Sequence, residues 1–122
     1  MKVITTKKAP EALGPYSVGI ISNGLIYTSG MLGINPLTNT LEEGIEKQAN
    51  QAFKNIEAIL NEANSSLDKV IKTTLFLSDL ANFSIVNEIY AKYFTSKPSR
   101  SCVEVKKLPK GALLEIEVIA EE

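Results

Sequence analysis

The apolar residues between Gly44 and Asn64 fall on one face of a helix, and no other feature of the sequence constrains the fold as strongly. They recur three and four residues apart, as the turns of an α-helix require. Such a helix must bury its apolar face against a second layer of structure. The chain has 122 residues, which is the length of one domain, so we expect a single domain over residues 1–122.

Short β-rich segments stand on both sides of this helix. Asn23-Gly24 separates two of them, and this dipeptide is the strongest short signal for a hairpin turn. A second helix is predicted near residues 82–94, and a loop over residues 30–39. The expected strands cover residues 3–4, 18–22, 25–29, 70–77, 99–105 and 113–120. We therefore predict an α+β fold, in which two helices pack on one face of a mixed sheet.

The last two predicted strands carry apolar residues on both faces. In residues 113–120, Leu114, Ile116 and Val118 face one side, while Leu113 and Ile119 face the other. Two helices can cover one side of the sheet only. We expect a second copy of the chain to cover the other side, which predicts a homo-oligomer.

The composition excludes several kinds of site. The chain has no His and a single Cys, so it has no His-based triad, no His-based zinc site and no internal disulfide. Its net charge of −1 argues against a nucleic-acid binder, which usually has a basic excess. No apolar run is long enough to span a membrane, and the first residues do not resemble a signal peptide, so a cytoplasmic protein is expected.

Arg100 is the only Arg in a chain that otherwise uses Lys for its positive charges. Arg differs from Lys in that its planar guanidinium grips a carboxylate or phosphate with two parallel hydrogen bonds. An ion pair with a Glu of the same chain explains a lone Arg equally well. Both interpretations stay open at this point.

The two final strands suggest a place for chemistry. If they pair as a hairpin about Leu108-Pro109, Cys102 lies opposite Glu115, and Arg100 lies on the same face, diagonal to Glu115. An Arg and a Glu so placed are suited to binding an anionic substrate and activating a water molecule. The alternative is a cross-strand salt bridge that needs no ligand.

Three further residues are weaker candidates. Gly14-Pro15-Tyr16 is a tight turn that fixes an aromatic hydroxyl, although a Tyr in a turn more often serves packing. Ser29-Gly30 ends a strand with a hydroxyl and a residue that allows close approach of a ligand. Cys102 has no His to activate it, and is expected to be a small buried side chain.

Several motifs, in order along nearly the whole chain, resemble the RidA (YjgF-type) reactive intermediate deaminases. They are Gly14-Pro15-Tyr16-Ser17, Thr28-Ser29-Gly30, Lys72-Thr73-Thr74, Val86-Asn87, the run from Pro98 to Val105, Leu108-Pro109-Lys110 and Leu114-Glu115-Ile116-Glu117. The resemblance implies a chorismate-mutase-like fold and a homotrimer with pockets at the subunit interfaces. It also implies cofactor-free hydrolysis of enamines and imines, such as 2-aminoacrylate or 2-iminobutyrate, to 2-keto acids and ammonia.

The resemblance also implies roles for individual residues. Arg100 would bind the substrate carboxylate, and Glu115 would place and activate the attacking water. Cys102 would contribute mainly through its backbone, while Tyr16, Ser29 and Asn87 would line the pocket.

The chain departs from the family pattern at three places, which affects the expected substrate but not the reaction class. Met31 and Val18 each stand where a Gln is usual. The segment 95–97 is short and lacks an aromatic residue.

Two other functions remain as alternatives. A non-catalytic module of the same fold would bind a 2-keto acid or amino acid and regulate a partner protein. Such a module would use Arg100 and would have no need of Glu115 for turnover. A ribonuclease or translation inhibitor, also associated with the family, has little support from the charge balance.

Overall fold

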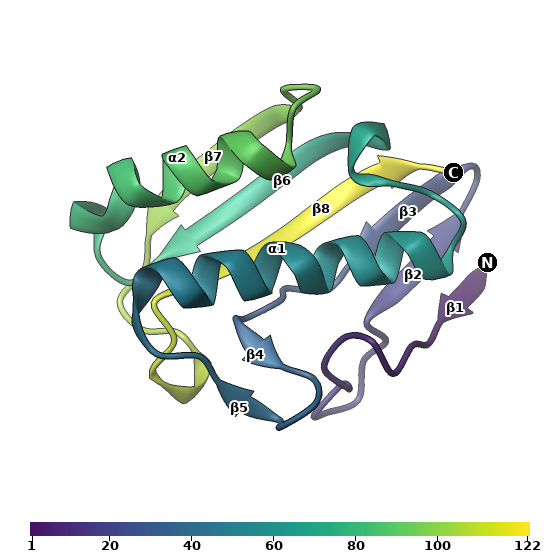
Figure 1. Cartoon of the computed structure of the whole chain (residues 1–122). Helices are drawn as coiled ribbons and strands as arrows, with labels where there is room; N and C mark the ends of the chain where they lie inside the picture. Colours follow the sequence, from purple (N-terminus) through teal and green to yellow (C-terminus); the bar gives the residue numbers. More distant parts are fainter.

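The computed structural model describes all 122 residues, and its two helices and larger sheet are shown in Figure 1. The helices are α1 (Gly44–Glu62) and α2 (Phe83–Tyr93), with 3-10 turns at Leu67–Lys69, Leu80–Asn82 and Pro109–Gly111. The strands are β1 (Lys2–Ile4), β2 (Gly19–Ser22), β3 (Leu25–Thr28), β4 (Ile34–Asn35), β5 (Thr40–Leu41), β6 (Val70–Leu77), β7 (Ser99–Glu104) and β8 (Leu114–Glu121).

Six of the strands form one sheet, in the order β1-β2-β3-β8-β6-β7. All neighbouring pairs are antiparallel except β6 and β7, which are parallel and are joined through α2. Both helices lie on one face of this sheet, as Figure 1 shows. The α+β class predicted from the sequence is therefore confirmed.

The core lies between the sheet and the apolar faces of the helices. Phe53 of α1 is fully buried, and it meets the rings of Tyr90, Tyr93 and Phe94 edge to face at 5.4–5.9 Å between centroids. These contacts join α1 to α2 and to the residue after it. The strands add fully buried side chains beneath the helices, among them Ile26, Leu75, Leu77, Leu114 and Ile116.

Local sequence signals predicted most of these elements correctly. The β2–β3 hairpin turns at Asn23 and Gly24, whose φ angles of 51° and 79° are the positive values that this turn requires. Strand β6 covers the predicted residues, and both helices lie within two residues of their predicted ends. The predicted loop over residues 30–39 differs, because it contains β4, which pairs with β5 in a small separate hairpin.

The prediction that the last two strands pair as a hairpin is wrong. Strand β6 lies between them and pairs with β7 on one side and β8 on the other. The sequence favours a hairpin because β7 and β8 are neighbours along the chain. However, the eight-residue β6 has buried side chains along one face and forms a ladder with both strands, which leaves β7 at the edge of the sheet.

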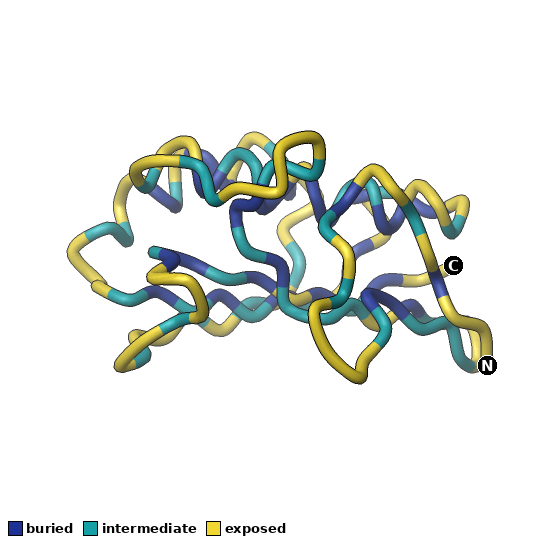
Figure 2. Tube along the Cα trace, turned by 90° about the horizontal axis from the view of Figure 1, so that it is seen from below, coloured by how far each residue is buried: buried dark blue, intermediate teal, exposed yellow.

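The second face of the sheet has no helix over it, as Figure 2 shows in a view with the helices above and the strands below. Tyr27 of β3 and Val103 of β7 project from this face and are 42% and 44% exposed. They share it with polar residues, including Lys72, whose Nζ donates to Ser101 Oγ at 3.1 Å. Neither helix is long and apolar enough to cross a membrane.

Candidate functional site

Arg100 lies on the helix-covered face of the edge strand β7. It pairs with Thr73 of β6, whose side chain is fully buried under the helices. The guanidinium donates from Nη1 to Oδ1 of Asn87 on α2, at 2.7 Å. Its carbon atom also lies 4.7 Å from the ring centroid of Tyr90 and 5.6 Å from that of Phe83. These partners are all neutral, so they leave the charge of Arg100 available to an anion.

A hollow of about 580 Å³ opens beside this guanidinium. It is lined by residues of α2 and of the segment that leads into β7, namely Asn87, Tyr90, Ala91, Phe94, Thr95, Lys97, Pro98 and Arg100. Cys102 lies two residues further along β7 and packs half-buried against the core. Burial raises the pKa of its thiol, and the charge of Arg100 opposes this only in part, so the thiol is neutral near pH 7.

Glu115 lies on β8, opposite Phe76 of β6, and points away from the helices. It is half-buried. Burial raises the pKa of its carboxyl above the usual range, and the negative charge of Glu117 adds to this effect. A carboxyl with a raised pKa is a better proton acceptor than an exposed one, and a pKa nearer the working pH suits a group that must both take up and return a proton.

Gly30 provides the space that the Glu115 side chain occupies. A Cβ atom at residue 30 would lie 2.7 Å from both Cδ and Oε2 of Glu115, which is closer than real contacts allow. The sequence suggested that Gly30 allows close approach of a ligand. In the folded chain, the group that approaches Gly30 is a carboxylate of the protein itself.

A second hollow, of about 160 Å³, opens over Glu115 and Gly30. Tyr16 lines it and is half exposed, with its hydroxyl accepting from the backbone N–H of Leu13 at 3.4 Å. Ser29 supports the same region, because its Oγ donates to the carbonyl of Ser17 at 2.6 Å. Its hydroxyl therefore ties the end of β3 to the turn that carries Tyr16.

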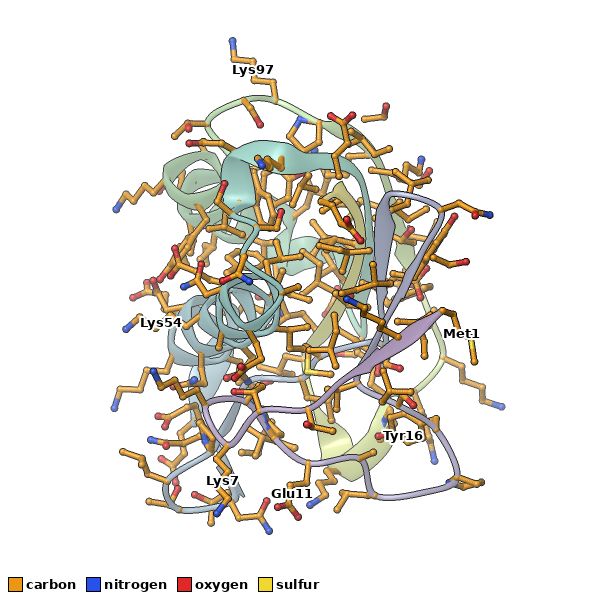
Figure 3. All side chains as sticks on the ribbon, turned by 90° about the vertical axis from the view of Figure 1, so that its right-hand side faces the viewer. Met1, Lys7, Glu11, Tyr16, Lys54 and Lys97 are labelled. Carbon is orange, nitrogen blue, oxygen red and sulfur yellow. The ribbon has the colours of Figure 1, made fainter.

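The candidate residues thus form two groups that do not meet within one chain. Arg100 is paired with Thr73 and Glu115 with Phe76, and residues three apart on a strand face opposite sides of a sheet. The expected position of Arg100 diagonal to Glu115 on one face is therefore wrong, and so is the alternative of a cross-strand salt bridge. Figure 3 shows the separation: Lys97, which lines the first hollow, lies at the top, and Tyr16, which lines the second, lies near the bottom.

Sequence reasoning missed several residues around these groups. Phe83 and Tyr90 of α2 contact the guanidinium of Arg100. Leu13, Pro109 and Lys110 line the hollow of Glu115. Only the spacing of Phe83, Asn87 and Tyr90, four and three residues apart, pointed to a shared helix face.

Two of the residues where the chain departs from the family pattern are buried. Met31 pairs through its backbone with Ile116, and Val18 lies in the core.

No group of three or more His, Cys, Asp or Glu side chains is arranged to hold a metal ion. The pKa values of Glu115, of Cys102 and of Tyr90, which lies beside Arg100, are all raised. Perturbed pKa values gather at functional sites, and Tyr90 lines one hollow while Glu115 lines the other, which supports both hollows as candidate sites.

Comparison with known proteins identifies the family. Residues 6–122 match the model of the family described as Endoribonuclease L-PSP. A Lactococcus lactis protein named AldR, provisionally described as a regulator, is 53% identical over 99% of this chain and 98% of its own length. Reactive Intermediate Deaminase A from Arabidopsis thaliana, a chloroplast protein, is 48% identical over 98% of this chain and 65% of its own length.

Solved structures agree with this result. The crystal structure of Escherichia coli TdcF with bound serine superposes with a TM-score of 0.96 and 38% sequence identity, and it covers 100% of this chain and 99% of its own. The family model spans almost the whole chain and the fold is shared throughout, which confirms the resemblance read from the sequence motifs. The chain belongs to the Endoribonuclease L-PSP family, the family of the YjgF and RidA proteins.

Proposed function

We propose that the protein hydrolyses 2-imino and 2-enamino acids, such as 2-iminobutyrate and 2-aminoacrylate, to 2-keto acids and ammonia. The observation that carries this proposal is the environment of Arg100. Its half-buried guanidinium has neutral partners and adjoins an open hollow, which suits it to bind a carboxylate in a bidentate manner. The name of the Arabidopsis relative supports the same reaction class.

In the proposed reaction, Arg100 holds the substrate carboxylate and Glu115 acts as general base. Glu115 takes a proton from water as the water oxygen attacks the imine carbon. Glu115 passes this proton to the imine nitrogen, which gives a carbinolamine. The hydroxyl proton of the carbinolamine then moves to the same nitrogen as the C–N bond breaks and the C=O bond forms, so ammonia leaves and a 2-keto acid remains. An enamine enters the same path after it takes up a proton on carbon and releases one from nitrogen, which converts it to the imine. The substrate is already reactive, so orientation and one base suffice.

We further propose that the site is completed by two copies of the chain. Arg100 and Glu115 face opposite sides of the sheet, so one bound substrate reaches both only if they come from different copies. The uncovered sheet face, with Tyr27 and Val103 exposed, offers a surface for such an assembly. A homotrimer with a chorismate-mutase-like arrangement, as the family resemblance implied, fits this requirement.

The remaining candidate residues receive supporting roles in this proposal. Asn87 holds one N–H of Arg100 and so orients the guanidinium. Tyr16 lines the wall of the Glu115 hollow, and Ser29 fixes the turn that carries it. Cys102 lies next to the Arg100 group as a neutral thiol and contributes through its backbone.

A non-catalytic module that binds a small carboxylate is the second candidate. The description of AldR as a regulator favours it, as does the serine bound to TdcF, an amino acid that carries a carboxylate. Such a module requires the Arg100 group, while the burial that raises the pKa of Glu115 has no purpose in it.

The cytoplasmic location expected from the sequence stays a prediction.

Ammonia release from freshly generated 2-iminobutyrate, with and without the protein, tests the proposal. We expect the protein to accelerate release well above the spontaneous rate, without added metal or cofactor. Binding of 2-ketobutyrate with no acceleration would favour the binding module. Cleavage of RNA by the same preparation, absent from an Arg100→Gln variant, would support the nuclease activity in the family's name.

A further inference from the structure

We propose that Tyr90 is the positioning residue for Arg100, and that its ring fixes the plane in which the guanidinium meets the substrate carboxylate. The inference deepens the function proposed above and rests on it for the identity of the ligand. The geometry on which it stands lies within one chain.

The guanidinium of Arg100 lies over the Tyr90 ring, with its carbon atom 4.7 Å from the ring centroid. Phe83 adds a more distant aromatic contact at 5.6 Å. A guanidinium over a ring is attracted to its face by the ring quadrupole, and the planar group can stack there. Stacking leaves the in-plane N–H groups free, and Asn87 accepts only one of them.

The Tyr90 ring is itself held in place on three sides. Its hydroxyl shares a hydrogen bond of 2.8 Å with Oγ1 of the fully buried Thr73. Its ring stacks on Phe94 at 4.5 Å between centroids and meets Phe53 edge to face at 5.9 Å. A side chain with this many fixed partners can serve as a rigid platform for a flexible one.

These contacts connect Arg100, Thr73 and Tyr90 to one another, and so link the sheet to α2. Arg100 pairs with Thr73 in the sheet, Thr73 binds the Tyr90 hydroxyl, and the Tyr90 ring lies under the guanidinium. Burial raises the pKa of Tyr90, and the hydrogen bond with Thr73 and the charge of Arg100 oppose this rise in part. The long side chain of Arg100 is therefore ordered before the ligand arrives, which reduces the entropy lost on binding.

Three variants test this role. Tyr90→Leu removes the ring, while Tyr90→Phe keeps the ring and removes only the hydroxyl. Tyr93→Leu is the matched control, because Tyr93 is an aromatic residue of the same helix that also packs on Phe53 but contacts Asn50 instead of Arg100. Binding of 2-ketobutyrate by calorimetry, KM and kcat for 2-iminobutyrate, and melting temperature are measured for each.

We expect Tyr90→Leu to weaken 2-ketobutyrate binding and raise KM by about tenfold, the effect of losing a partly desolvated contact between a cation and a ring. Tyr90→Phe keeps the ring and its contacts with Phe94 and Phe53 but loses the hydrogen bond to Thr73, so its affinity should lie between those of Tyr90→Leu and the natural protein. Tyr93→Leu should lower the melting temperature to a similar extent as Tyr90→Leu, with unchanged affinity. Equal affinities for Tyr90→Leu and Tyr93→Leu would overturn the proposal.

A second readout does not depend on the ligand or on the proposed reaction. Arg100 is the only Arg, so its side-chain N–H signal in an isotope-labelled sample is unique. A guanidinium stacked on a ring gives a shifted signal, which Tyr90→Leu should move to the position of a free arginine while Tyr93→Leu does not. If Tyr90→Leu fails to fold, Phe83→Leu should move the signal in the same direction. An unmoved signal overturns the proposal, whereas an enzyme assay that fails in the natural protein overturns only the proposed function.

Discussion

Arg100 and Glu115 project from opposite faces of one sheet, because their partners on β6, Thr73 and Phe76, are three residues apart. Each lines its own hollow, and the two hollows share no lining residue. One chain therefore carries two half-sites, one with a cation and one with a half-buried carboxyl. In the proposed reaction, a substrate lies between the half-sites of two copies.

Glu115→Gln should lower the rate of imine hydrolysis by about 10²–10⁴-fold, the usual cost of losing a general base. The change keeps the size of the side chain and removes its charge, so the fold and the oligomer should persist. Binding of 2-ketobutyrate should also persist, since Arg100 is intact. Turnover and calorimetric affinity are measured on the same preparation. A folded oligomer with unchanged turnover would contradict the role of Glu115.

Arg100→Lys should lose most of the activity although the positive charge is kept. A single ammonium cannot form two parallel hydrogen bonds to a carboxylate, and it cannot stack as a plane on the Tyr90 ring. We expect the loss to appear as a higher KM and weaker binding of 2-ketobutyrate, as measured by steady-state kinetics and calorimetry. Near-natural kinetics in this variant would show that charge alone is sufficient.

Gly30→Ala should impair turnover by displacing the Glu115 carboxyl, because the new Cβ would lie 2.7 Å from Cδ and Oε2. A displacement of about 1 Å at a catalytic group costs on the order of 10²-fold in rate. Gly19→Ala is the matched control: its Cβ would crowd Ile4 Cδ1 at 2.9 Å, in the core. The control should lose melting temperature with its turnover per folded molecule unchanged. Equal turnover in both variants would rule out the displacement.

The stability of the protein should fall as the pH rises through the titration of Glu115. Burial raises the pKa of this carboxyl in the folded state above its ordinary value in the unfolded chain, and the negative charge of Glu117 adds to the effect. Between the two pKa values the folded state binds more protons than the unfolded state, so the free energy of unfolding decreases with pH. Denaturant titrations over this range should show the decrease in the natural protein and its loss in Glu115→Gln. The same slope in both proteins would place the titration elsewhere.

The sequence predicted both helices and the strands of the six-stranded sheet because their signals are local, but it predicted no strand at β4 or β5. The apolar stripe of α1, the Asn23-Gly24 turn and the run that forms β6 are each determined within a few residues of the chain. The pairing of β7 with β6 is not local. Helix α2 joins these two strands along the chain, and its packing on the sheet determines where β7 begins. The hairpin predicted for the last two strands failed for this reason.

The same difference explains what the sequence could say about the site. Alternation along a strand correctly placed Arg100 and Cys102 on one face, since alternation is a local rule. Whether Arg100 and Glu115 share a face depends on which strands pair in the sheet. The predicted hairpin paired β7 directly with β8, and this wrong pairing put both residues on the same face. The contact of Tyr90 with Arg100 depends on how α2 packs on β7, which no local pattern of the sequence determines.

The most direct test of the account is complementation between Arg100→Gln and Glu115→Gln chains. Each variant alone should be nearly inactive, and so should a chain that carries both changes. Oligomers assembled from equal amounts of the two single variants contain interfaces with an intact Arg100 from one chain and an intact Glu115 from the other. If each site takes these residues from different copies, random assembly restores about one quarter of the natural activity, since each residue is intact at half of the positions. Activity no higher than that of the separate variants, in oligomers shown to contain both chains, would contradict the account.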